Sequence, residues 1–380
     1  MNSPRIALIG CGAIAEAMYL PALAKVPGAL DNTVLVDTNE ARLAQLAAKF
    51  GAKHTATNYL ECDVEGAIVA TPHHLHHRIS LDFLARGKHV LCEKPLTEQA
   101  HEARELCAQA DASGVTLQVN LTRRLLPSYR KIKEMIDAGA LGTLREIYYL
   151  DGEYFQWPTV SGFYFKKTSP AGVMLDRGAH GLDLICWWLG QAPEVVESQT
   201  DSFGGFEGTA LLQLKCAACD IRVKLSWLQR MDNIFRIRGD KGTVQGKLNN
   251  WHNIDFIDPS GRTRGIRLNG ESYEYTDFAL KLVHNFIGVL RGSEQPLIPA
   301  RSVLPSVELI EACYAHAARI DQPWYTAITQ PHPEASGNAP ASGAARPSAI
   351  RSALGAAGMN GGDPGRPSSP ERRSAEVQAA

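Results

Sequence analysis

The sequence predicts an α/β protein in which a doubly wound parallel sheet is followed by an α+β domain with an open, mainly antiparallel sheet. In the first third of the chain, short apolar runs alternate with helical patterns. A glycine-rich turn at residues 10–15 joins the first apolar run to a helical pattern. Between residues 195 and 268, strand-like runs follow one another with turns and no helix between them.

The apolar runs of the first third are the expected strands of the parallel sheet. They are continuous and rich in Ile, Val and Leu, as strands buried on both faces are. Gly51, Gly87 and Gly114 close the intervening helical patterns, where a left-handed residue commonly ends a helix. The expected strands are Arg5–Ile9, Thr33–Val36, Gly66–Ala70, His89–Cys92 and Val115–Val119.

The second domain is predicted to mix helices with the antiparallel strands. A long alternating strand is expected at 144–156, and its open sheet must cover one face. Helices are expected at about 127–138, 173–189, 277–291 and 303–317. We place the domains at 1–121 and 122–329. Roughly two-thirds of the last 50 residues are Ala, Gly, Pro or Ser, so 330–380 is expected to be a disordered tail.

The composition argues against nucleic-acid and membrane partners. The formal net charge of the 380 residues is −1, and 44% of them are hydrophobic. No run approaches the roughly 18 apolar residues of a membrane span, and the N-terminus lacks the pattern of a secretory signal. We therefore expect a cytoplasmic protein whose partner is a small molecule.

Gly10-Cys11-Gly12-Ala13-Ile14-Ala15 has the spacing of a dinucleotide-binding turn. Its first glycine permits a tight turn, its second lets the backbone approach a pyrophosphate, and a small third residue allows helix–strand packing. The helix N-terminus attracts phosphate. The pattern predicts a Rossmann domain whose cofactor contacts include Gly10, Cys11, Gly12, Ala13 and Ile14; the alternative is a tight turn without a ligand.

Asp37 ends the second expected strand, where an acidic residue accepts hydrogen bonds from the adenosine ribose. Because a carboxylate repels a 2′-phosphate, Asp37 favours NAD as the cofactor, with NADP possible. The alternative role is an N-cap for the helix beginning near Glu40, and the two roles are compatible.

Two other strands end in residues suited to the nicotinamide half of the cofactor. Thr71-Pro72 and Glu93-Lys94-Pro95 each follow an expected strand, and ligands of such sheets lie outside the carboxyl ends of the strands. A desolvated lysine can release its proton, so Lys94 is a candidate for proton transfer. The alternative is a surface charge pair before a turn.

Asp176 and His180 are a further pair of residues whose types and spacing suit catalysis. They are four residues apart, so on a helix they share a face. A carboxylate beside an imidazole fixes its tautomer and stabilises its charged form, which suits a general acid or base. The alternative is a helix-start network with Asp176 as the cap.

Two further patterns contain the residue types of metal sites without the arrangement of ligands that a metal needs. Cys216-Ala-Ala-Cys219 has no second ligand pair, and its spacing fits a hairpin turn between flanking strands better. The side chains of the tract 73–77, with four histidines, are expected to fan out, with one touching the cofactor and the rest exposed. We expect no metal.

These motifs together resemble the glucose–fructose oxidoreductase/inositol dehydrogenase (Gfo/Idh/MocA) superfamily over nearly all of residues 4–327. The resemblance rests on their order and spacing. The matching segments are Gly10-x-Gly12-x-x-Ala15, Thr71-Pro72 with His76, Cys92-Glu93-Lys94-Pro95-Leu96, Arg124 with Pro127, Gly139-Ala140-Leu141-Gly142, and Asp176-x-Gly178-x-His180-x-x-Asp183.

The resemblance implies reversible hydride transfer between nicotinamide and a carbinol carbon. Lys94 or His180 would move the hydroxyl proton while Asp176 orients and charges the histidine. A cis peptide is implied before Pro95, and His76 is implied at the cofactor site. The open sheet of such proteins often mediates homodimers or homotetramers. This chain departs from the family pattern at several positions of the expected pocket, namely His73, Asn120, Ser169-Pro170-Ala171-Gly172 and Arg177.

We expect the substrate to be a sugar, cyclitol or sugar derivative. Trp157 and Tyr164 offer aromatic faces to a sugar ring, and Arg124 and Arg177 offer charge to an anionic group. The alternative is that the aromatics are ordinary core residues. Two other functions remain open: NAD-assisted elimination or glycoside cleavage on the same fold, and a cofactor-sensing regulator without catalysis.

Overall fold

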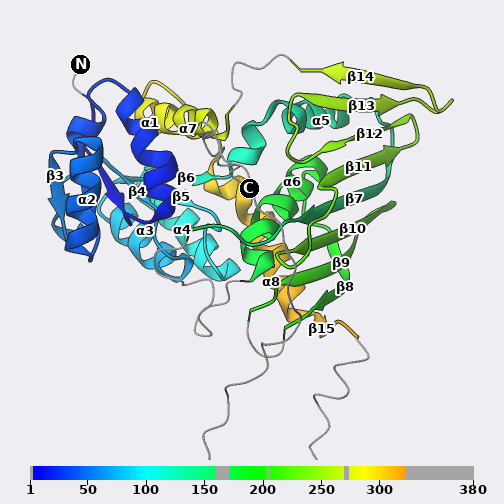
Figure 1. Cartoon of the computed structure of the whole chain (residues 1–380), viewed down its shortest axis with the longest axis horizontal. Helices are drawn as coiled ribbons and strands as arrows, with labels where there is room; N and C mark the ends of the chain where they lie inside the picture. The colour runs from blue at the N-terminus through cyan, green and yellow to red at the C-terminus, as the bar shows by residue number, and fades with distance from the viewer. Residues whose placement is uncertain (1–2, 159–171, 203–205, 269–273, 322–380) are drawn as a thin grey trace, which may run out of the picture. The chain divides into compact units, whose positions relative to one another are not determined.

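A six-stranded parallel sheet forms the N-terminal part of the computed structural model, which describes residues 3–158, 172–202, 206–268 and 274–321 (Figure 1). Its strand order is β3-β2-β1-β4-β5-β6, the doubly wound arrangement expected from the sequence. The strands are β1 (Ile6–Ile9), β2 (Thr33–Val36), β3 (His54–Ala56), β4 (Gly66–Val69), β5 (His89–Glu93) and β6 (Leu117–Asn120).

The helices around this sheet end as the sequence predicts. Gly51, Gly87 and Gly114 have φ values of 77°, 70° and 64°, in the left-handed region that favours glycine. The helices are α1 (Leu20–Lys25), α2 (Glu40–Phe50), α3 (His76–Ala85) and α4 (Ala100–Ala112). A fifth helix, α7 (Tyr275–Leu290), packs against α1 although it comes from the far end of the sequence. Phe286 and Leu290 of α7 lie directly against Gly66 of β4.

The second sheet contains nine strands of the described residues, in the order β14-β13-β12-β11-β7-β10-β9-β8-β15. It is mainly antiparallel, as predicted, but β10 runs parallel to β7 and β15 parallel to β8. The strands are β7 (Leu144–Gly152), β8 (Glu194–Thr200), β9 (Thr209–Cys216), β10 (Cys219–Ser226), β11 (Ile234–Gly239), β12 (Gly242–Lys247), β13 (Asn253–Ile257), β14 (Thr263–Arg267) and β15 (Ala317–Arg319).

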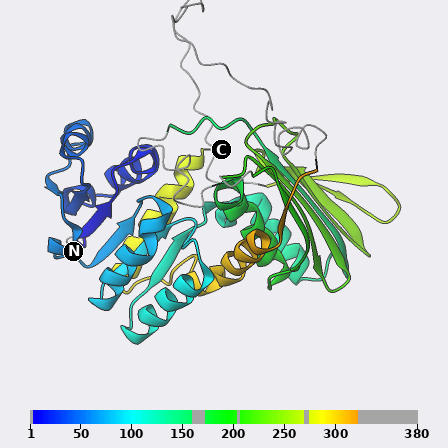
Figure 2. The same cartoon turned by 90° about the horizontal axis from the view of Figure 1, so that it is seen from below.

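One face of this sheet is covered by α5 (Pro127–Asp137), α6 (Ala179–Leu189) and α8 (Leu304–Ala315) (Figure 2). Along β10, Ile221 and Val223 are buried under these helices, while Asp220 and Arg222, which alternate with them, are exposed. Cys216 and Cys219 face each other at the tight turn between β9 and β10, so the predicted hairpin is confirmed. The described residues contain no helix with the length and apolarity that a membrane crossing requires.

Candidate active site

The glycine-rich turn has the shape that a dinucleotide needs. Gly10 has φ 92°, and a Cβ added to it would lie 2.5 Å from the Ala70 carbonyl oxygen, so the turn is closely packed there. A Cβ added to Gly12 would meet nothing within 4 Å. The backbone at Gly12 therefore borders open space at the start of a helix, where a pyrophosphate could approach.

The Asp37 carboxylate is hydrogen-bonded to the backbone of this turn. Its Oδ2 accepts a hydrogen bond of 2.7 Å from the backbone N–H of Cys11, and its Oδ1 accepts one of 2.9 Å from Asn39. The N-cap of α2 is Asn39, which accepts from the backbone N–H of Arg42, so the capping role considered for Asp37 is wrong. The residues present thus fit the pyrophosphate and ribose of a dinucleotide, with the carboxylate at the end of β2.

The ends of β4 and β5 are joined by a buried histidine. The two ring nitrogens of His76 lie 2.8 Å from the carbonyl oxygens of Pro95 and Thr71, and its side chain is fully buried. The Lys94–Pro95 peptide bond is cis, as the resemblance implied. His73 is also buried, at 4% exposure. The expectation that all but one of the histidines in 73–77 are exposed is therefore wrong.

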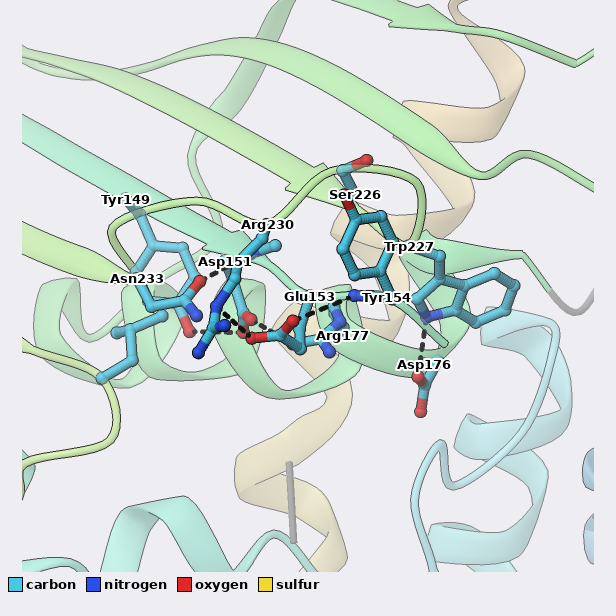
Figure 3. Close-up of polar contacts among 12 residues, drawn as sticks. Tyr149, Asp151, Glu153, Tyr154, Asp176, Arg177, Ser226, Trp227, Arg230 and Asn233 are labelled. Atoms are coloured by element: carbon cyan, nitrogen blue, oxygen red, sulfur yellow. Dashed lines mark hydrogen bonds and ion pairs between the residues drawn. The ribbon is translucent and has the colours of Figure 1, made fainter. Parts of the chain in front are cut away.

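Lys94 and Asp176 lie in direct contact although 82 residues separate them. The Lys94 ammonium donates to Asp176 Oδ1 at 2.6 Å and to the Asp176 carbonyl oxygen at 3.2 Å. The second carboxylate oxygen accepts from the indole N–H of Trp227 at 3.1 Å (Figure 3). Burial alone would raise the pKa of Asp176, but the Lys94 charge and these hydrogen bonds hold that pKa below its ordinary value.

His180 does not form the expected pair with Asp176. Asp176 lies in a π-helical turn, Met174–Gly178, and its carboxylate is engaged by Lys94 and Trp227, while Nδ1 of His180 is buried with no hydrogen-bond partner among the described residues. Burial, and then the positive charges of Lys94, Arg123 and Arg177, hold the pKa of His180 well below its ordinary value. The imidazole is therefore neutral near pH 7, and the expectation that Asp176 charges it is wrong.

Glu93 supports Lys94 from the buried side. Its Oε1 accepts from the Tyr19 hydroxyl at 2.6 Å and from the Asn120 amide at 2.5 Å, and its Oε2 accepts from the Lys94 backbone N–H at 3.1 Å. At 6% exposure, Glu93 has little surface left for a cofactor. Asn120, one of the departures from the family pattern, thus belongs to the network that fixes the end of β5.

Arg123 and Arg177 share one carboxylate beside this centre. Arg177 Nη1 contacts Asp151 Oδ1 at 2.5 Å (Figure 3). Arg123 Nη1 contacts Asp151 Oδ2 at 2.8 Å and the Tyr149 hydroxyl at 2.7 Å. Despite burial, the two guanidinium groups lower the pKa of Asp151. Arg124, expected at the substrate, is instead paired with Asp183.

Of the two aromatic residues expected at the substrate, the structure describes Trp157 but not Tyr164. Trp157 is half-buried and packs against the core. Tyr164 lies outside the described residues, as do the departures Ser169, Pro170 and Ala171, and all of the expected tail.

Sequence reasoning missed Trp227, Asp151, Arg123 and Tyr19, which reach the site from distant segments. In the described part of the chain, no group of three or more His, Cys, Asp or Glu side chains has the arrangement of a metal site.

A Rossmann domain whose strand ends converge with a lysine–aspartate pair and a buried histidine defines a nicotinamide-dependent oxidoreductase. Family models agree. Residues 4–121 match the model described as an oxidoreductase family with an NAD-binding Rossmann fold, and residues 129–245 match the GFO/IDH/MocA C-terminal domain. The chain belongs to the Gfo/Idh/MocA family of oxidoreductases.

Curated relatives and solved structures agree with this assignment. The rhizopine catabolism protein MocA of Rhizobium meliloti is 30% identical over 227 residues, which cover 58% of this chain and 69% of that protein. The trans-1,2-dihydrobenzene-1,2-diol dehydrogenase of Oryctolagus cuniculus is 30% identical over 241 residues, covering 60% and 70%. A 3-ketoreductase from Actinomadura kijaniata, crystallised with NADP and TDP-benzene, shares the fold with a TM-score of 0.73 at 22% identity, covering 85% of this chain and all of the other.

Proposed function

We propose that this oxidoreductase interconverts a carbinol and a carbonyl group on a sugar, cyclitol or sugar derivative, with NAD as its preferred cofactor. The observation that carries the proposal is the 2.6 Å contact between Lys94 and Asp176 beyond the carboxyl end of β5. In an open parallel sheet this edge receives the ligand. Relatives that include a levoglucosan dehydrogenase and a 1,5-anhydro-D-fructose reductase support a sugar-like substrate.

In this proposal the chain's own residues handle the proton. A bound nicotinamide supplies the carbon that accepts or returns a hydride. The Lys94 amino group, oriented by its contact with Asp176, donates a proton to the substrate oxygen in the reducing direction and takes the hydroxyl proton back in the oxidising direction. His180, neutral and largely buried, offers a hydrogen bond to the same oxygen.

Other residues of the site bind and position. Gly10, Cys11, Gly12, Ala13 and Ile14 would hold the pyrophosphate, Asp37 the adenosine ribose, and Thr71, Pro72 and Pro95 the nicotinamide half. Glu93 and His76, both buried, keep the ends of β4 and β5 in place. Trp227 orients the Asp176 carboxylate through its indole N–H.

We also propose a cytoplasmic homodimer or homotetramer that forms through the uncovered face of the second sheet. A groove on that face is lined in part by Tyr148, Leu150 and Leu211, which gives it apolar surface for a second copy. Native mass spectrometry would count the subunits, and a monomer at micromolar concentration would contradict the proposal.

The reaction is tested by a panel of cyclitols, aldoses and nucleotide sugars with NAD and NADP, followed by nicotinamide absorbance. We expect turnover on at least one polyol. Replacing the proton carrier in Lys94→Met should lower kcat by about 10²- to 10⁴-fold while NADH still binds. Lys215→Met is the matched control, because that lysine pairs with Asp220 on the surface. No turnover on any polyol, or an active Lys94→Met variant, would contradict the proposal.

A further inference from the structure

Arg177 and Arg123 are two buried cations with incomplete hydrogen bonding. Arg177 is 7% exposed and Arg123 9% exposed. Among the described residues, Arg177 has one hydrogen bond, from Nη1 to Asp151, and its Nε is buried without a partner. Arg123 uses only Nη1, toward Tyr149 and Asp151. A buried guanidinium donor without a partner, as Arg177 Nε is, is costly, so its retention needs a physical reason.

The charge around these arginines is positive. Their two guanidinium groups face a single carboxylate, Asp151. Lys94 does not change this balance, since its charge is matched by Asp176 at 2.6 Å. His180 adds no positive charge near pH 7, because burial and the charges of Lys94 and both arginines hold its pKa well below the ordinary value. Among the described residues, the group formed by Arg123, Arg177 and Asp151 therefore carries one positive charge more than negative charge.

The free donors belong to the same site as the proposed proton carrier. Arg177 directly follows Asp176, and its charge acts on both Asp176 and His180. Figure 3 shows the side chain of Arg177 reaching toward Asp151, while Asp176 points to Trp227. Nε and Nη2 of Arg123 and Nη2 of Arg177 have no hydrogen-bond partner among the described residues and are not fully buried, so they can donate to water or to a ligand.

We propose that Arg177, together with Arg123, binds an anionic group of the substrate, a carboxylate or a phosphate, so that the enzyme selects acidic sugars or cyclitols over neutral ones. The planar donor fork of arginine fits either group in a two-pronged contact. The inference rests on the proposed function, because it assigns the substrate class of the same pocket. The Arg177 position is one where this chain departs from the family pattern, which makes the selection a property of this chain.

The test compares substrates that share a skeleton and differ in charge: D-glucose, D-glucuronate, D-gluconate and D-glucose 6-phosphate. We expect kcat/KM to be at least about tenfold higher for one of the anions than for glucose. The acids and the phosphate ester separate the two sources of negative charge. A wild-type enzyme that uses glucose as well as every anion would overturn the inference.

Two substitutions change the net charge of the proposed anion site in opposite directions. Arg177→Met should lower kcat/KM for the anion by about 10- to 100-fold and for glucose by less than about threefold. This variant should fold, because Asp151 keeps its 2.8 Å contact with Arg123. Asp151→Asn removes the counter-charge and should strengthen anion binding instead. Arg145→Met, on a surface pair with Asp240, is the control.

A binding measurement separates this inference from the proposed function. The enzyme–NADH complex is titrated with glucuronate and with glucose 6-phosphate while cofactor fluorescence is followed. A response that Arg177→Met abolishes and Arg145→Met retains supports the inference even without turnover. Equal losses for charged and neutral substrates in Arg177→Met, or no response to either anion, would overturn it. Lack of turnover on every polyol counts against the proposed function alone.

Discussion

Arg124 and Asp183 form a two-pronged ion pair in which both side chains are almost completely buried. Arg124 Nε contacts Asp183 Oδ2 at 2.7 Å, and Arg124 Nη2 contacts Asp183 Oδ1 at 2.6 Å. Nη1 donates to the Ser302 hydroxyl at 2.8 Å, and the Ser306 hydroxyl donates to Asp183 at 3.1 Å. The pair thus joins the segment between β6 and α5 to α6 and to the start of α8.

Arg124→Met should lower the free energy of unfolding by about 3–5 kcal/mol, because it leaves the Asp183 carboxylate buried without its cation. Urea unfolding followed by circular dichroism measures the change. Arg104→Met is the control, since its pair with Glu308 is exposed and should be worth less than about 1 kcal/mol. A similar small loss in both variants would contradict a structural role for Arg124 and would return it to the substrate-binding candidates.

The two glycines of the cofactor turn should respond differently to alanine. Gly10→Ala forces a Cβ to within 2.5 Å of a backbone oxygen and imposes strain at φ 92°, so it should lower Tm. Gly12→Ala places its methyl group in open space, so Tm should hold while NADH binding weakens by roughly tenfold or more. Fluorescence titration with NADH and a thermal melt measure both effects. Equal NADH affinity in Gly12→Ala and wild type would contradict the pyrophosphate site.

The preference for NAD over NADP should depend on the negative charge of Asp37 and on how far Glu16 neutralises the positive charge of Arg42. The Arg42 guanidinium lies near the turn, donating to the Cys11 carbonyl oxygen at 2.8 Å, but Glu16 pairs with it at 2.5 Å. Asp37→Asn keeps an acceptor for Cys11 while removing the charge that repels a 2′-phosphate. It should raise the ratio of kcat/KM for NADP over NAD by about tenfold, and adding Glu16→Gln should raise it further.

The same kinetics on the wild type provide the reference. NAD should be the better cofactor before any substitution. Lys49→Met removes the other cation that contacts Glu16, at 2.6 Å, without touching Arg42, and is the control for general loss of surface charge. A wild type that prefers NADP would contradict the role given to Asp37.

The N-terminal sheet could be predicted because its strands are buried on both faces and therefore appear as continuous apolar runs. The exception is β3, His54–Ala56, which is absent from the predicted strands. It lies at the edge of the sheet and its residues are exposed or half-buried, so no apolar run marks it. The left-handed glycines at the helix ends were equally visible, because glycine adopts that conformation without strain.

The partners within the site could not be predicted from spacing alone. Helical periodicity pairs Asp176 with His180, whereas its partners are Lys94, 82 residues away, and Trp227, 51 residues away. Periodicity also cannot distinguish the π-helical turn around Asp176 from an ordinary helix. One signal was available: Asp151 alternates with Ile147 and Tyr149 on the buried face of β7. A carboxylate at such a position needs buried cations, and two arginines supply them.

The buried histidines should make folding stability depend on pH between about 7.5 and 5. Burial first, and then the charges of Lys94, Arg123 and Arg177, hold the pKa of His180 well below its ordinary 6.5. Below pH 6.5 the unfolded chain therefore binds a proton that the folded chain does not. This contribution to stability is fully present above pH 6.5 and is lost as pH falls toward the folded pKa, at up to about 1.4 kcal/mol per pH unit.

His180→Asn removes that proton difference, so the fall in unfolding free energy from pH 7.5 to 5 should become shallower than in the wild type. Urea unfolding at half-unit pH steps measures the slope. His74→Asn, at an exposed position of the histidine tract, should leave the slope unchanged. His73 and His76 have pKa values lowered mainly by burial, so part of the wild-type slope should persist in His180→Asn. If the slope of His180→Asn equals that of the wild type, folding does not lower the pKa of His180, which would contradict the effect of burial and nearby positive charge assigned to it.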